Sequence, residues 1–204
     1  MSNDTVKDDI AYMRKLAEYG RRGPILGGAF LASAGVVFGL ACLVQWAAQT
    51  GRLAIADREM VWIWAAAYAV FALIWFALWF GFRSRRQAAG GNASNIVFGI
   101  AWIVNAVGVL VAYGTTMIAA SITHMQDMFY AYVPLIFIFY GIAWGLSAVM
   151  ARRPWMYLAA CGSFGCAFAV AALTRDPAQL ALMAGALVVL LTLPGLKLML
   201  EEPK

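Results

Sequence analysis

Apolar residues along this chain fall into long runs that short polar stretches interrupt. The runs cover six segments, namely residues 25–48, 60–81, 96–121, 129–150, 155–173 and 178–200. A helix needs about 20 apolar residues to cross the hydrocarbon core of a bilayer, whereas a barrel strand needs only about 10 that alternate in polarity. The pattern therefore predicts six transmembrane helices joined by short loops.

The composition agrees with this pattern. Hydrophobic residues make up 64% of the 204 residues, and charged residues make up only 12%, which is about half the usual share. A soluble globule of this size could not bury so much apolar surface, so ordinary soluble enzymes, nucleic-acid binders and disordered linkers are excluded. We expect an all-α integral membrane protein: a six-helix bundle over residues 25–200, a cytoplasmic N-terminal segment over 1–24 and a short tail over 201–204.

Positive charges are distributed unevenly between the two sides of the predicted helices. One side carries twelve: Lys7, Arg14, Lys15, Arg21, Arg22, Arg83, Arg85, Arg86, Arg152, Arg153, Lys197 and Lys204. The other side carries three: Arg52, Arg58 and Arg175. Lysine and arginine accumulate in cytoplasmic loops, so both termini are predicted to be cytoplasmic. The pI of about 9.3 follows from this topology and requires no nucleic-acid partner.

The choice of membrane rests on composition alone. Arginine outnumbers lysine by eleven to four and alanine is abundant, a bias typical of GC-rich bacteria. A multi-pass protein of the bacterial inner membrane is therefore expected.

The predicted helices differ in the faces they offer for packing. The first carries small residues at helical spacing, a pattern that lets another backbone approach closely: Gly28, Ala32, Gly35, Gly39 and Cys42. The second is surrounded by large aromatic rings and is expected on the lipid-facing periphery. The prolines inside the fourth and sixth helices, Pro134 and Pro194, predict kinks. The cysteines, Cys42, Cys161 and Cys166, are expected to be buried thiols that pack as small hydrophobes.

The third predicted helix has the most polar face. Its stripe consists of Asn105, Gly108, Ala112, Thr116 and Ala119, with Thr115 beside it. A buried amide in hydrocarbon is costly unless it is hydrogen-bonded, so the stripe should face the bundle interior. It could supply an interhelical hydrogen bond, or it could line a path for a solute.

A short motif of the third helix recurs in the fourth. Phe98-Gly-Ile-Ala-Trp102 resembles Tyr140-Gly-Ile-Ala-Trp144, and Asn105 then corresponds to Ser147, which joins Asn105, Thr115 and Thr116 as an interior polar candidate. Inverted repeats occur in transporters, but so biased an alphabet produces short matches easily, and coincidence is the simpler interpretation.

The N-terminal segment is the one patterned region outside the predicted membrane helices. Residues 5–19 fit an amphipathic helix that begins with a capping box at Thr5. Its candidate docking residues are Val6, Ile10, Met13, Leu16, Arg14, Arg21 and Arg22. The helix could pack on the bundle itself, on the bilayer or on a partner protein.

The candidates for chemistry are few. His124, Met125 and Met128 have side chains that suit Cu(I), but a single histidine beside scattered methionines is a weak pattern, so no metal and no cofactor are predicted. The chain shows no arrangement of nucleophile and base, and no charged residue lies near the middle of a predicted span.

These observations favour a non-enzymatic membrane protein that acts through protein contacts. In this hypothesis the N-terminal helix and the inner loops dock or restrain a cytoplasmic or membrane partner. The alternative is a small permease or channel for a neutral or lipophilic solute. A membrane enzyme or redox protein would require a cofactor that nothing in the sequence indicates. The oligomeric state is left open.

Overall fold

The structure is a computed structural model that describes residues 25–81, 93–125 and 128–201. It contains helices and no strand within these ranges. The helices are α2 (Gly28–Gln49), α3 (Met60–Gly81), α5 (Ala93–Thr123), α6 (Met128–Ala151), α7 (Pro154–Ala172), α8 (Ala178–Leu187) and α9 (Leu193–Glu201). A short 3₁₀ helix, η1 (Asp57–Glu59), precedes α3, and a π-helical turn, η2 (Val188–Thr192), joins α8 to α9.

Six helices in the described part of the chain are long and apolar enough to cross a membrane, with α8, η2 and α9 counted as one. The prediction of six such helices is therefore confirmed. The largest difference from the expected bounds is in the third helix, which runs over Ala93–Thr123 and exceeds the predicted segment at both ends. The predicted N-terminal helix lies outside the described residues.

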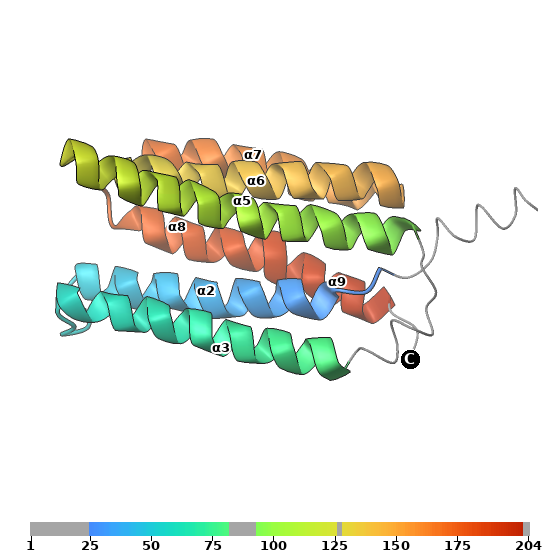
Figure 1. Ribbon diagram of the computed structural model, residues 1–204, viewed down its shortest axis with the longest axis horizontal. Helices are drawn as coiled ribbons and strands as arrows, with labels where there is room; N and C mark the ends of the chain where they lie inside the picture. Colours follow the sequence, from blue (N-terminus) through green and yellow to red (C-terminus); the bar gives the residue numbers. More distant parts are fainter. Residues whose placement is uncertain (1–24, 82–92, 126–127, 202–204) are drawn as a thin grey trace, which may run out of the picture.

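The helices form two groups (Figure 1). In the first group α6 packs between α5 and α7. In the second, α2 packs against α3 and against α8, η2 and α9, and α8 and η2 also contact α7. The start of α2 and the end of α9 lie at the same end of the helices, called the terminal end below.

The predicted small-residue face of α2 forms its contact with the last helix. All five of its residues are buried, as predicted. A Cβ atom at Gly35 would lie 2.8 Å from the main-chain oxygen of Leu187, and one at Gly195 would lie 2.6 Å from the nitrogen of Ala32. Glycine therefore allows the two backbones to touch, as is common where helices pack in membranes.

Helix α3 lies at the periphery, as its aromatic sequence predicts. Ala67 is its one buried residue in the described structure. The helix is attached to α2 through the indole N–H of Trp64, which donates to Gln45 Oε1 at 2.8 Å, and through the ring of Tyr68, whose centroid lies 5.1 Å from that of Phe38.

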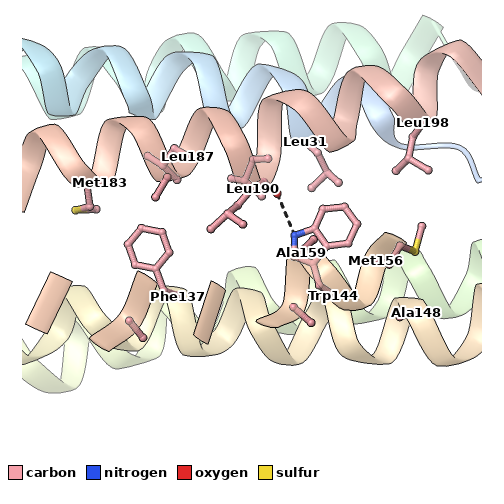
Figure 2. Packing of buried hydrophobic residues seen from close by; sticks show 14 of the residues in the cluster. Leu31, Phe137, Trp144, Ala148, Met156, Ala159, Met183, Leu187, Leu190 and Leu198 are labelled. Atoms are coloured by element: carbon pink, nitrogen blue, oxygen red, sulfur yellow. Dashed lines mark hydrogen bonds between the residues drawn. The ribbon is translucent and has the colours of Figure 1, made fainter. Parts of the chain in front are cut away.

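The hydrophobic core lies where the two groups meet. Figure 2 shows Phe137 and Trp144 of α6 facing Leu187 and Leu190 of the last helix, and Met156 of α7 on the side of Leu198. Packing of these side chains joins the two groups, and α5 and α3 leave most of their surface exposed.

The two prolines inside helices have different effects. Helix α6 remains α-helical through Pro134. The last helix widens into the π-helical turn η2 just before Pro194, and there the N–H of Leu193 bonds to the oxygen of Val188, five residues back. Such π turns are a recognised way of absorbing a break in the helical hydrogen-bond ladder.

Candidate functional site

The polar stripe of α5 lies against α6. Asn105 is only 7% exposed, and the other four members of the stripe are also covered to a large extent. A Cβ at Gly108 would lie 3.0 Å from the ring of Phe139 on α6. Thr115, in contrast, is on the exposed side of α5. The candidate stripe is therefore an interhelical face, and Thr115 does not belong to it.

The hydroxyl groups among the candidates bond within their own helices. Thr116 donates to Ala112 O at 2.8 Å, Thr115 donates to Val111 O at 2.9 Å, and the buried Ser147 donates to Ala143 O at 2.7 Å. A serine or threonine that bonds four residues back satisfies its hydroxyl locally. In the described structure these three hydroxyl groups therefore donate within their own helices and not to a neighbouring helix.

Asn105 differs from them. Its Oδ1 atom is buried and has no hydrogen-bond partner among the described residues, and the same holds for the indole Nε1 of Trp102, one helical turn away. The ring of Trp102 packs between Phe98, Tyr140 and Trp144, with centroid distances of 6.1, 5.9 and 5.2 Å. Trp102 was not among the candidates from sequence. Its place in the repeated motif and its position three residues before Asn105 were the available signals.

A third buried polar atom without a described partner is Thr192 Oγ1. The hydroxyl lies directly over the backbone of Gly35, where a side chain at that position would collide with it. A Cα–H group can make a weak contact with such an oxygen.

The terminal end contains several polar contacts between segments of the chain. The N–H of Leu26 donates to Asn95 Oδ1 at 2.6 Å, and the hydroxyl of Ser94 donates to Met150 O at 3.4 Å. Ile25 is only 1% exposed. The point at which the N-terminal segment joins the helices is therefore held against the start of α5.

Charged side chains of the α6–α7 turn and of α9 also make contacts at the terminal end. Arg153 forms an ion pair with Glu201, and the ammonium group of Lys197 lies 4.6 Å from the ring centroid of Trp155. Partial burial lowers the pKa of Arg153, but an arginine keeps its charge at neutral pH. The neighbouring Arg152 is exposed.

The described structure does not gather the three candidate metal ligands into a site. His124 is exposed and has a positive φ of 56°, and Met125 is exposed beside it. Met128 Sδ accepts a hydrogen bond from the hydroxyl of Thr123 at 3.5 Å. Within the described ranges no group of three or more His, Cys, Asp or Glu side chains could hold a metal ion.

The expectation of three buried thiols was wrong for one of them. Cys42 is buried and Cys166 is partly buried, but Cys161 is exposed on α7. Its neighbour along the chain, Ala160, is the residue that turns inward, and this places Cys161 on the outer side of the helix.

The docking candidates of the N-terminal segment lie outside the described residues. They are Val6, Ile10, Met13, Leu16, Arg14, Arg21 and Arg22.

Six helices of this length and composition indicate a multi-pass helical membrane protein. No protein-family model matches the chain, and neither a curated protein nor a solved structure matches it.

Proposed function

We propose that this chain is a non-enzymatic protein of the bacterial inner membrane that acts through protein contacts. In this proposal the six helices form a bundle with both termini in the cytoplasm. Residues 5–19 form an amphipathic helix that, together with the inner loops, docks or restrains a partner protein.

The anchored start of α2 is the observation that carries this proposal. Ile25 is buried and Leu26 is hydrogen-bonded to Asn95, so the chain is held at a defined place on the terminal end where the N-terminal segment joins it. The exposed Arg152 and the Arg153–Glu201 pair belong to the same end. A tethered amphipathic helix beside ordered charged groups would present a partner with one combined surface.

The remainder of the chain offers little for catalysis. No acidic or basic residue lies near the middle of a helix, and the hydroxyls of Thr116 and Ser147 are engaged with their own backbones. Proton-coupled carriers commonly place costly ionisable groups at midplane. Protein contact is thus the function that these features favour.

The proposal can be tested by in-cell crosslinking in the native host. Ile10→Asp places a charge on the predicted apolar face of the N-terminal helix and should abolish crosslinks to a specific partner, which mass spectrometry identifies. Ser2→Asp adds the same charge outside that face and should leave the crosslinks unchanged. Equal crosslinking by both variants and by a chain lacking residues 1–20 would contradict the proposal.

A permease for a neutral or lipophilic solute is the second candidate, and the unpartnered Oδ1 of Asn105 favours it. Liposomes containing the protein should then take up such a solute, and Asn105→Leu should remove the flux. Thr115→Val is the matched control, because Thr115 lies on the exposed side of the same helix. Absence of flux for a panel of small neutral solutes would count against this candidate.

A further inference from the structure

The repeated motif of α5 and α6 forms a local two-fold arrangement. The ring of Phe98 lies 6.4 Å from that of Trp144, and the ring of Tyr140, the counterpart of Phe98, lies 5.9 Å from that of Trp102. Trp102 and Trp144, which correspond to each other, are also in contact. The aromatic residues of the two motifs therefore contact each other in corresponding pairs.

The hydrogen bonding of the two halves is not equivalent. Trp144 Nε1 donates to the carbonyl oxygen of Leu190, and Ser147 donates to its own helix. On the other side, the described residues provide no acceptor for Trp102 Nε1 and no donor for Asn105 Oδ1. Within the described residues this half thus lacks both an acceptor for Trp102 Nε1 and a donor for Asn105 Oδ1, and the two residues are three positions apart on α5.

We propose that a hydroxyl group binds between α5 and α6 at Trp102 and Asn105. A hydroxyl accepts one hydrogen bond and donates another, so it can accept from the Trp102 indole and donate to the Asn105 carbonyl. Leaving both groups unpaired in an apolar interior is costly. An ionised ligand is disfavoured, because no charged side chain of the described helices lies at this depth.

The surface beside the site is apolar. Ile100, Ile103 and Val104 are exposed on the same stretch of α5, so a molecule dissolved in the membrane could approach from this side with a small movement of side chains. The hydroxyl can belong to water or to a membrane-dissolved alcohol. The inference is independent of the proposed protein contacts and holds whether or not a solute is transported.

The experiment is NMR of protein containing ¹⁵N-tryptophan in phosphatidylcholine nanodiscs. Trp102→Phe identifies the Trp102 indole signal. Water as ligand predicts a cross-relaxation peak between this indole proton and water. An alcohol as ligand predicts a saturable shift of the same signal when 1-octanol is added, and no shift with octane, which has the same chain length and no hydroxyl.

Two variants decide whether Asn105 takes part. Asn105→Leu should remove the water peak or the octanol shift, whereas Thr115→Val should retain it. The remaining indole signals report whether each variant is folded, and Asn105→Thr, which keeps a hydrogen-bonding group, should retain part of the effect. The proposal is overturned if Trp102 shows neither response, or if its response persists unchanged in folded Asn105→Leu.

Discussion

The indole N–H of Trp144 donates to the main-chain oxygen of Leu190 at 3.0 Å, and Trp144 is 0% exposed (Figure 2). Leu190 lies four residues before Pro194, which has no N–H to donate to that oxygen. Trp144 of α6 thus supplies a donor to this main-chain oxygen of the last helix. The same bond joins the two groups of helices at the centre of the core.

Replacing Trp144 by Phe should lower the free energy of unfolding. The variant keeps an aromatic ring but leaves the Leu190 oxygen buried without this donor, which costs about 1–3 kcal/mol. Denaturant unfolding in detergent micelles measures the change. Trp62→Phe is the control, because Trp62 is 73% exposed on α3 and should give no measurable change. Equal effects of the two variants would contradict the role assigned to Trp144.

Pro194→Ala should make the Trp144→Phe change less costly. An alanine at this position supplies an N–H that can bond to Leu190 O, so the oxygen no longer depends on Trp144. A double-mutant cycle separates this coupling from the loss of the proline ring. The expected coupling is about 1 kcal/mol, the usual net value of a buried hydrogen bond. Additive effects would show that Pro194 does not create the need for Trp144.

Gly35→Ala should destabilise the contact between α2 and the last helix. Its new methyl group would lie 2.8 Å from both Leu187 O and Thr192 N, and backbone atoms cannot move aside at little cost. Overpacking of this kind typically costs about 1–3 kcal/mol. Gly145→Ala on α6 is the matched control: a Cβ there meets nothing within 4 Å, so the substitution should be neutral or stabilising through helix propensity. Thermal unfolding of both variants in the same detergent provides the comparison.

The features that could be predicted from sequence are those that the bilayer imposes. Helix length and apolar composition reveal the six long helices, and small residues at helical spacing reveal the face of α2 on which another backbone lies. The identity of that backbone could not be predicted, because a small-residue face fits any helix. The contact of Gly35 with Thr192 joins positions far apart in the sequence, and only the folded chain brings them together.

The candidate site also contains one residue that could be predicted from the sequence and one that could not. Asn105 was recognisable because a lone amide in an apolar helix is costly wherever it lies. Trp102 was not, because an indole N–H counts as a polar group in need of a partner only when its burial is known. Pro194 indicates that the last helix lacks one main-chain N–H donor. The sequence does not reveal that the indole of Trp144, on another helix, donates to Leu190 O nearby.

The positive residues outside the helices predict how the chain is oriented in the membrane. The loop between α2 and α3 should face the outside, since it carries only Arg52 and Arg58, and the segment between α3 and α5 should face the cytoplasm, since it carries Arg83, Arg85 and Arg86. In a chain whose native cysteines are replaced by alanine, Ala54→Cys should react with a membrane-impermeant maleimide in intact cells. Ala88→Cys should react only after the membrane is permeabilised, and the cysteine-free parent should not react. The reverse pattern would place both termini outside and would remove the basis for a cytoplasmic docking helix.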